Sequence, residues 1–293
     1  MAQNAPYDIF VLDFNNVDAL DFDFYASIQQ RLARVGEEFS TFAQSLWGKQ
    51  ASNFLDSSPG FDQMDDSWEP IRILGKGSFG LVGLWQKTGR KGEVKDQVAI
   101  KEMASHPDDE LSLDRDSRLA REAVIMKQLN DAERLEFGTN SNILRLRSFK
   151  NFPSAGRWRF YLEYAYGDLY KLINSYRAWN THLPEEFLWH VFNSLAKAAV
   201  VMEKGPFTNL ESQDPTKWSI THFDIKPENT YLGKPDKDGL CPSYPTIKVA
   251  DFGLAQMTGQ SDQRNPRLFR RKGTEGCQPP VSFSYLPMSS ASY

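Results

Sequence analysis

The sequence predicts an α+β fold with two lobes, a β-rich lobe followed by a more helical one. Short runs rich in β-branched and aromatic residues begin at Trp68, in WEPIRIL, LVGLW and QVAIKEM. A helical segment over 114–135 follows them, and strand-like runs return in ILRLRSF and WRFYLEY. The stretch PEEFLWHVFNSLAKAAVVMEK then predicts a long helix, because apolar residues recur on one face. Those residues are Phe187, Val191, Leu195, Ala198 and Met202.

An acidic extension, residues 1–67, precedes the first strand. Residues 1–66 hold 11 Asp or Glu against 3 Lys or Arg, a balance of −8, so the rest of the chain carries +4 of the total −4. This distribution argues against a general nucleic-acid binder. An apolar stripe from Tyr25 to Leu46 predicts an amphipathic helix over 24–47, and residues 56–66 read as an acidic linker. We favour packing of this helix on the following domain, with weak self-association as the alternative.

Composition excludes several other classes of protein. No stretch approaches the roughly 18 apolar residues that span a bilayer, so no membrane partner is expected. The two cysteines, Cys241 and Cys277, form neither a disulfide framework nor a metal-binding spacing. A reducing compartment, cytoplasmic or nuclear, fits this usage best.

A glycine-rich loop follows the first predicted strand. In LGKGSFGLVGLW, Gly75, Gly77 and Gly80 let backbone N–H groups approach an anion such as phosphate. A dinucleotide-binding loop of the same spacing needs a helix directly after it. Here a strand-like run follows, so the glycines predict the turn of a β-hairpin.

One lysine and one glutamate are expected to pair. Lys101 lies in the apolar strand VAIK, where simple alternation would point it to solvent. Glu122, however, lies on the apolar stripe of its helix with Ile125, Met126 and Leu129. A buried carboxylate needs a cation partner, and Lys101 is the natural candidate.

Two further segments carry polar groups suited to phosphate and metal. ITHFDIKPENTYL holds Asp224, Lys226 and Asn229, which alone could equally form a solvated turn. IKVADFGLA places Asp251 at the end of a strand. Magnesium takes few protein oxygens and keeps water or phosphate for the rest, so Asp251 with Asn229 would suffice to hold it.

Taken in order, these motifs resemble the eukaryotic protein kinase family. The glycine loop, VAIK, a helix glutamate, the HFDIKPEN loop, DFG and a closing GT segment follow the order of the family. The resemblance covers about residues 68–280 and implies a kinase domain with an N-lobe over 68–165 and a C-lobe over 166–280. Lysine two places after Asp224 is similar to serine/threonine kinases. The implied function is transfer of the γ-phosphate of ATP, with Mg²⁺, to a Ser or Thr hydroxyl of a protein substrate.

The resemblance also implies a role for each site residue. Asp224 would accept the proton of the substrate hydroxyl, and Lys226 would neutralise charge on the γ-phosphate. Asn229 and Asp251 would hold magnesium. Lys101, fixed by Glu122, would hold the α- and β-phosphates, while YLEYAYGDLY would be the hinge with Leu162 as gatekeeper. The nucleotide-binding set comprises Gly75, Lys76, Gly77, Ser78, Phe79, Gly80, Val82, Ala99, Lys101, Glu122, Glu163 and Ala165, with Asp168 reaching the ribose.

The pattern departs from the family in three places, one of them a pair of polar inserts, GKPDKDGLCPSYP and FTNLESQDPTK, that read as surface loops. Phe223 stands where most members have an arginine that pairs with a phosphorylated residue. In the closing segment Cys277, Pro279 and Val281 replace the usual Tyr, Ala and Glu, and the chain ends twelve residues after Val281. We therefore expect a C-lobe that lacks its later helices, a marginal fold there, and an uncharged tail over 281–293. The alternative function is a catalytically inactive, nucleotide-binding or scaffold module.

Overall fold

The computed structural model describes residues 51–57, 60, 67–77, 80–104, 121–137, 142–152, 155–204, 219–237, 241–259 and 272–278. The helix predicted over 24–47, Ser78 and Phe79 of the glycine loop, and the tail 281–293 lie outside these residues. No helix in the described part of the chain is long and apolar enough to cross a bilayer.

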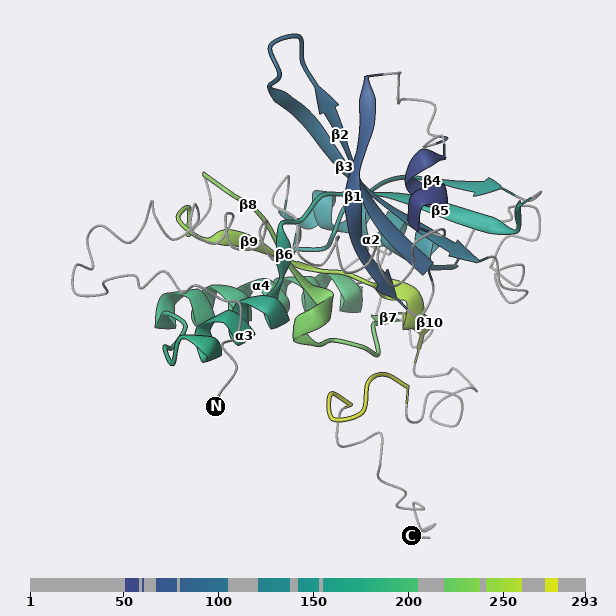
Figure 1. Cartoon of the computed structure of the whole chain (residues 1–293). Coiled ribbons are helices and arrows are strands. Elements are labelled where there is room, and N and C mark those ends of the chain that lie inside the picture. Colours follow the sequence, from purple (N-terminus) through teal and green to yellow (C-terminus); the bar gives the residue numbers. More distant parts are fainter. Residues whose placement is uncertain are drawn as a thin grey trace, which may run out of the picture.

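One antiparallel sheet of five strands forms the first lobe (Figure 1). Its strands are β1 (Trp68–Gly77), β2 (Gly80–Thr88), β3 (Val94–Ala104), β4 (Leu146–Phe152) and β5 (Arg157–Glu163), in the order β1-β2-β3-β5-β4. The predicted β-rich lobe is thus confirmed. Strand β4 begins three residues later than the predicted run, because Ile143 and Leu144 pair instead with Val249 of the second lobe.

Alternation of side chains gives this sheet two apolar faces. On β3, Ala99 and Met103 belong to one buried cluster, whereas Val98 and Ile100 belong to another. We call the first side the inner face and the second the outer face. Lys101 shares the parity of Ala99 and Met103, so it lies on the inner face and not toward solvent.

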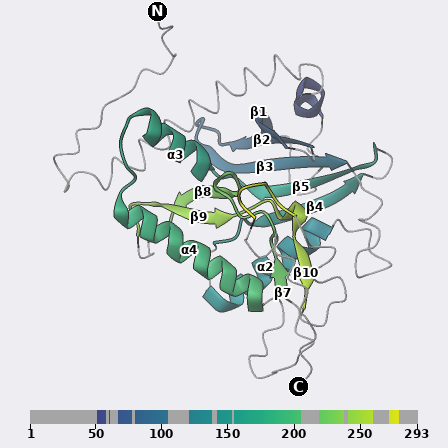
Figure 2. The same ribbon diagram turned by 90° about the horizontal axis from the view of Figure 1, so that it is seen from below.

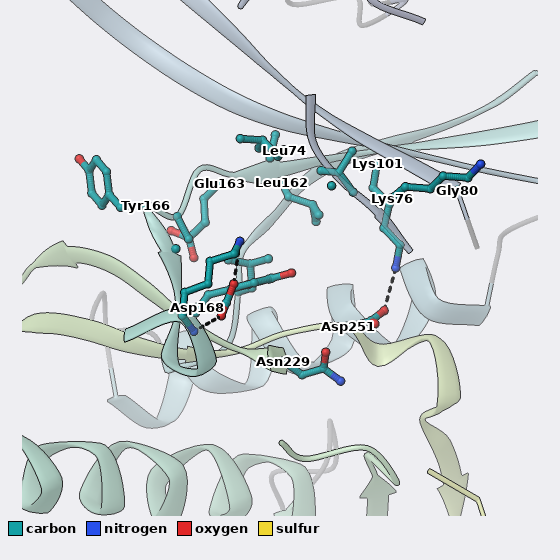
Figure 3. Close-up of a pocket in the computed structure, with 18 of the residues that line it drawn as sticks. Leu74, Lys76, Gly80, Lys101, Leu162, Glu163, Tyr166, Asp168, Asn229 and Asp251 are labelled. Carbon is teal, nitrogen blue, oxygen red and sulfur yellow. Dashed lines mark hydrogen bonds and ion pairs between the residues drawn. The ribbon is translucent and has the colours of Figure 1, made fainter. Parts of the chain in front are cut away.

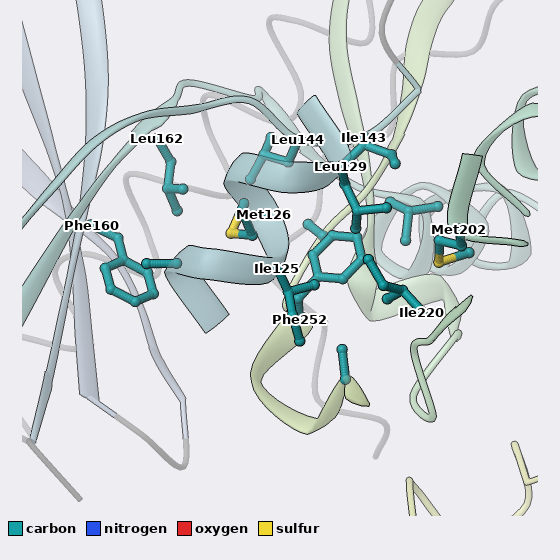
Figure 4. Close-up of a cluster of buried hydrophobic side chains, with 14 of the residues drawn as sticks. Ile125, Met126, Leu129, Ile143, Leu144, Phe160, Leu162, Met202, Ile220 and Phe252 are labelled. Carbon is teal, nitrogen blue, oxygen red and sulfur yellow. The ribbon is translucent and has the colours of Figure 1, made fainter. Parts of the chain in front are cut away.

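Helix α2 (Arg121–Phe137) packs under the inner face. It ends two residues beyond the predicted segment, whose first part lies outside the described residues. Its buried side chains connect the sheet to the second lobe in one core cluster (Figure 4). The cluster includes Ile125, Met126, Leu129, Phe160, Leu162, Met202, Ile220 and Phe252.

A short helix over residues 51–56 covers the outer face. Ala51 and Phe54 are buried there, and the Phe54 ring meets Trp85 edge-on with 5.2 Å between centroids. Arg159 of β5 donates to Ser57 Oγ (2.7 Å) and to Glu102 of β3 (2.8 Å). The folded unit therefore includes residues that precede the first strand.

The second lobe combines small sheets with two longer helices. Strands β6 (Gly167–Asp168), β8 (Thr230–Pro235) and β9 (Pro245–Val249) form one sheet, and β7 (Ser219–Thr221) pairs with β10 (Gln256–Thr258). The helices are α3 (Leu169–Ala178) and α4 (Glu185–Lys204). Two 3-10 turns also occur here: η4 (Pro227–Asn229) lies within the HFDIKPEN loop, and η5 (Phe252–Leu254) follows Asp251. In Figure 1, α3 and α4 lie below the β8-β9 hairpin, on the side away from the five-stranded sheet, and Figure 2 shows the same two helices from below.

The apolar face of α4 has a partner within this chain. Phe187 and Ala198 are fully buried, and Val191 and Met202 are 9% exposed. They pack against β9, β7 and α2. The stripe thus has partner surfaces among the described residues of this chain. Exposed apolar side chains lie on other positions of α4, at Leu188, Trp189 and Phe192.

Candidate active site

A cavity of about 350 Å³ lies between the inner face of the five-stranded sheet and the β6-β8-β9 sheet (Figure 3). Apolar side chains and a few charged ones line it, the usual composition of a ligand pocket. The apolar residues are Leu74, Val82, Ala99, Met126, Leu144 and Leu162. The charged residues are Arg72, Lys76, Lys101, Glu122, Glu163, Asp168, Lys171 and Asp251.

Lys101 joins the two lobes at this pocket. Its Nζ lies 2.8 Å from Glu122 Oε1 of α2 and 2.9 Å from Asp251 Oδ1. The structure thus contains the ion pair predicted from the burial of Glu122. Burial alone would lower the pKa of Lys101, but the two carboxylates outweigh it and raise that pKa. The ammonium is a fixed positive charge beside the cavity.

Asp251 follows β9 in a left-handed backbone conformation, with φ 62° and ψ 67°. This region is costly for a residue with a side chain and is found where surrounding contacts hold it. Burial would raise the pKa of its carboxyl, but the charge and hydrogen bond of Lys101 lower it overall. Asp251 is therefore ionised at neutral pH.

His222 fixes the Asp251 segment to the HFDIKPEN loop, which we call the catalytic loop. Its Nε2 donates to the carbonyl of Ala250 (3.0 Å), and its Nδ1 accepts from the backbone N–H of Asp224 (3.2 Å). Its ring also lies 4.7 Å from that of the buried Phe252. Burial lowers the pKa of His222, which keeps the ring neutral and able to hold both roles.

Asp224 receives hydrogen bonds on both carboxylate oxygens. Oδ1 accepts from the backbone N–H (2.9 Å) and the hydroxyl (2.7 Å) of Thr274. Oδ2 lies 3.0 Å from Lys226 Nζ and accepts from Asn229 Nδ2 at 3.0 Å. Burial opposes ionisation, yet these donors lower the pKa of Asp224 overall. The carboxylate is held ionised and in one orientation.

Asn229 and Asp251 fit a magnesium ion by their chemistry. The side-chain hydrogen bonds of Asn229 use its amide nitrogen, toward the Asp224 carbonyl (2.9 Å) and Oδ2, so its carbonyl oxygen is the atom suited to a metal. Asp251 uses Oδ1 for Lys101, which leaves Oδ2. One carboxylate and one amide oxygen match the small protein ligand set of Mg²⁺. Within the described residues no group of three or more His, Cys, Asp or Glu could hold a metal.

Two glycines allow the backbone to approach where a side chain could not. A Cβ at Gly80, beside the glycine-rich turn, would lie 1.7 Å from the carbonyl oxygen of Glu102. A Cβ at Gly273, whose φ is +94°, would lie 2.0 Å from the carbonyl oxygen of Phe223. The first glycine lets the start of β2 approach β3 closely, and the second brings Thr274 onto Asp224.

The predicted hinge lines the pocket, but two of its carboxylates have local partners. The Glu163 carboxylate bonds Lys248 and the backbone N–H of Arg145, both at 2.8 Å, and its backbone N–H donates to the Arg145 carbonyl (3.0 Å). A contact of the Glu163 backbone with a base stays a prediction. Asp168 caps α3 by accepting from the backbone N–H of Lys171 (2.8 Å) and also pairs with Lys171 Nζ (3.0 Å). A ribose contact of Asp168 stays a prediction.

Most predicted site residues converge at this pocket. Those that line it are Gly75, Lys76, Gly80, Val82, Ala99, Lys101, Glu122, Leu162, Glu163, Ala165, Asp168, Asn229 and Asp251. Asp224 and Lys226 adjoin it through Asn229. Sequence reasoning missed Thr274 as a partner of Asp224, and also Tyr166 and Tyr231 of the pocket wall. Their parts depend on tertiary contacts that no short motif displays.

Comparison with known proteins identifies the relatives of this chain. The family model for the protein kinase domain matches residues 68–281. The G2-specific protein kinase nimA of Emericella nidulans is 24% identical over 216 residues, covering 67% of this chain and 27% of that protein. Serine/threonine-protein kinase ULK3 of Xenopus laevis is 27% identical, covering 68% of this chain and 36% of that protein. Mitogen-activated protein kinase 6 of Arabidopsis thaliana is 24% identical, with coverage of 66% and 39%. The chain therefore spans well under half of each relative.

Proposed function

This chain belongs to the protein kinase family, and on that premise we propose that it transfers the γ-phosphate of Mg-ATP to a serine or threonine hydroxyl of a protein. The observation that carries the proposal is the connection between Asp224 and the pocket. Asn229 donates to Asp224 and also lines the cavity that holds Lys101 and Asp251. A proton acceptor for a hydroxyl thus adjoins charges suited to a metal-bound phosphate.

The contacts of each site residue indicate its role in phosphate transfer. Lys101 supplies a fixed cation for the phosphates, and Glu122 holds it from the opposite side. Asn229 and Asp251 would hold Mg²⁺, which when bound neutralises charge on the phosphate oxygens. Asp224 orients the attacking hydroxyl and takes its proton. Lys226, 3.0 Å from Asp224, lies where it can offset charge on the transferring group.

Thr274 connects Asp224 with Lys226. Its hydroxyl donates to Asp224 and accepts from Lys226 Nζ at 2.6 Å, so the segment 272–278 closes over both groups. Lys226, two residues after Asp224, is similar to serine/threonine kinases and supports a Ser or Thr acceptor. The names of the relatives above, which include a serine/threonine-protein kinase, agree with this assignment. Cytoplasmic or nuclear localisation, expected from the sequence, remains part of the proposal.

Phosphotransfer by the full chain tests the proposal. Peptides with Ser, Thr or Tyr acceptors are incubated with Mg-ATP, and the phosphorylated residue is identified by mass spectrometry. Asp224→Asn should lower the rate by about 10²–10³-fold. Asp131→Asn, a change of an exposed carboxylate on α2, should leave the rate unchanged. Nucleotide binding without any transfer above the Asp224→Asn background would favour the alternative, a non-catalytic nucleotide-binding module.

A thermal-shift titration with Mg-ATP tests the binding half separately. The wild-type chain should be stabilised by the nucleotide, since ligand that binds only the folded state raises its stability. The Lys101→Ala, Asp251→Ala double variant should lose most of that shift. An undiminished shift in the double variant would overturn the assignment of the site.

A further inference from the structure

Ser57 follows the short helix on the outer face of the five-stranded sheet, away from the pocket. The helix covers residues 51–56 and is drawn in purple in Figure 1. The Ser57 hydroxyl donates to the carbonyl of Phe54 (2.6 Å) and accepts from Arg159 Nη2 of β5 (2.7 Å). A phosphate carried by this oxygen would therefore lie directly beside a guanidinium, the group that suits it best.

The guanidinium of Arg159 is buried and held in one orientation. The residue is 7% exposed, and its guanidinium carbon lies 5.5 Å from the ring centroid of Phe54 and 5.3 Å from that of Phe152. Its Nε donates to Glu102 Oε2 of β3 at 2.8 Å. An arginine whose planar fork is already oriented loses little conformational entropy when it binds a phosphate. The structure thus contains a preformed partner for a phosphate on Ser57.

The register of the sheet brings further positive charge close to Arg159. Its cross-strand neighbours are Lys150 of β4 on one side and Glu102 of β3 on the other. Arg157, two residues before it on β5, binds Glu102 through Nη1 at 2.7 Å. Residues opposite each other, or two apart on one strand, lie on the same face. Among the described residues, these three strands therefore present three cations and one carboxylate around Arg159 on the outer face.

Two effects oppose a phosphate at this position, and neither outweighs the arginine. The phosphate would remove the hydroxyl donor to the Phe54 carbonyl, and it would add negative charge at the C-terminal end of a helix. The second effect is weaker than one charge-assisted hydrogen bond from an arginine, because the helix is short and its end is near solvent. The adjacent carboxylate, Asp56, is exposed, so water and salt screen its charge. The balance of charges favours a bound phosphate.

We propose that Ser57 is a phosphorylation site, and that Arg159 with Lys150 binds its phosphate and fixes the 51–57 segment on the outer face. In the modification, Ser57 Oγ bonds to the γ-phosphorus of ATP and the bond from that phosphorus to the bridging oxygen of ADP breaks. The hydroxyl proton passes to a base of the modifying kinase. Ser57 is half-buried, so the short helix opens for the modifying enzyme and closes again over the phosphate.

This site goes beyond the proposed function, because the kinase that modifies Ser57 need not be this chain. Its consequence reaches the pocket through β3. Arg159 binds Glu102, and Glu102 is the neighbour of Lys101 on that strand. A phosphate that fixes Arg159 and the helix would steady the strand that carries the pocket lysine.

The full chain with Ser57→phosphoserine tests the binding of the phosphate without requiring catalysis. Ser52→phosphoserine, at an exposed position of the same helix, is the matched control. The second pKa of a phosphoserine is ordinarily about 6. Because Arg159 favours the dianion, ³¹P NMR should give a pKa at position 57 that is about one unit below that at position 52, a tenfold preference. Hydrogen exchange of the 51–57 amides should slow about tenfold with the phosphate at 57 and should not slow with it at 52.

Two variants of the phosphoserine-57 chain identify the cations that bind the phosphate. Arg159→Gln should abolish both effects. Lys150→Gln keeps the pair between Arg159 and Glu102 intact and should reduce both effects, so it serves where Arg159→Gln does not fold. A phosphate at position 57 that titrates like the one at position 52 would overturn the binding site. Exchange in the 51–57 segment that stays equal or becomes faster with the phosphate at 57 would overturn it as well.

Mass spectrometry tests the modification itself. The wild-type full chain is incubated with Mg-ATP and an extract of the cells that make it, and its phosphorylated residues are mapped. Phosphate should appear on Ser57 and be missing from that peptide in Ser57→Ala. Absence of phosphate from Ser57 in the wild type would overturn the assignment. The phosphotransfer assay of the proposed function uses a separate peptide substrate, so failure of one proposal is distinguishable from failure of the other.

Discussion

Contacts on both sides of Asp251 hold its backbone and its carboxylate in position at the site. A left-handed backbone would be unfavourable for an aspartate in isolation, yet here contacts on both sides hold it. Lys101 binds its carboxylate, and the carbonyl of the preceding Ala250 accepts from His222. The conformation that directs the carboxylate to the pocket is thus maintained by neighbours from both lobes.

This arrangement predicts how stability depends on pH. The pKa of Asp251 is lower in the fold than its ordinary value of 3.8, because Lys101 favours the ionised form. Its contribution to stability is therefore fully present above pH 3.8 and is lost as pH falls through the folded pKa. The pKa of Lys101 is raised, so the ammonium stays charged throughout this window.

Urea unfolding of the wild type and Asp251→Asn from pH 7 to pH 3 measures that contribution. The difference in unfolding free energy between the two proteins should be constant near neutral pH and shrink below pH 3.8. Asp131→Asn removes an exposed carboxylate and serves as the control. A difference for Asp251→Asn that stays constant down to pH 3 would contradict the lowered pKa.

Residues whose chemistry is visible in a short stretch could be predicted from the sequence. Glu122 lies among apolar neighbours on its helix, so its carboxylate was expected to be buried and to need a cation partner. Lys101 was the natural candidate. Thr274 gave no such signal, because its partner Asp224 lies 50 positions away. Tyr231 was missed for a related reason, since only the register of β8 places it on the pocket wall.

At the scale of elements, the helix over 51–56 is joined to the strand that carries Lys101. Arg159 lies over the rings of Phe54 and Phe152, bonds Ser57 and binds Glu102, the neighbour of Lys101 on β3. Glu102 and Lys101 point to opposite faces of the sheet. The helix therefore braces the outer face directly behind the pocket.

Phe54→Ala tests this bracing. The side chain is 3% exposed, so its removal should lower the free energy of unfolding by about 3–5 kcal/mol. Asn53→Ala changes an exposed residue of the same turn and should have little effect. Chemical denaturation of both variants measures the difference. Equal stability of the two would show that the helix does not pack on the sheet as described.

The segment 272–278 is held at the catalytic loop by contacts that need no phosphate. Lys272 Nζ lies 5.7 Å from the centroid of the Phe223 ring, a cation–π contact. Gly273 approaches the Phe223 carbonyl closely, and Thr274 bonds Asp224. Phe223 itself has a φ of 67°. Phe223, which stands where most of the family has arginine, thus contacts this segment through a cation–π interaction with Lys272.

We therefore predict that phosphotransfer, where it is measured, does not require a phosphorylated activation segment. Phosphatase-treated protein should keep its rate within about twofold, whereas Gly273→Ala should lower it at least tenfold because the Cβ would displace Thr274 from Asp224. The rate of phosphate transfer to a peptide measures both. Loss of activity after phosphatase treatment would contradict the prediction.

For the long helix α4, apolar periodicity predicts which face is buried but not which elements bury it. Its apolar stripe was predicted correctly as a buried face, but the identity of the surface that buries it was not. A helix of this pattern requires some partner, and the pattern is the same whichever elements supply it. Here β9, β7 and α2 supply it, although they come from distant parts of the sequence.

At the scale of the whole molecule, one core passes through both lobes. The cluster beneath the sheet includes Ala99 of β3 together with Ala198 and Val201 of α4 and Val249 of β9. Two ion pairs also cross between the lobes, Lys101 with Asp251 and Glu163 with Lys248. The β-rich lobe and the described part of the helical lobe are therefore expected to unfold together.

Hydrogen exchange tests that expectation against the marginal second lobe predicted from the sequence. Amides of α4 from Val191 to Met202 and of β8 should exchange as slowly as those of β3 and β5, because all contribute to connected clusters and open only in global unfolding. The sheet strands serve as the internal reference within the same sample. Fast exchange of α4 beside slow exchange of β3 would show that the second lobe opens alone. The shared core through α2 would then be too weak to couple the two lobes, and the cross-lobe ion pairs would break before the sheet unfolds.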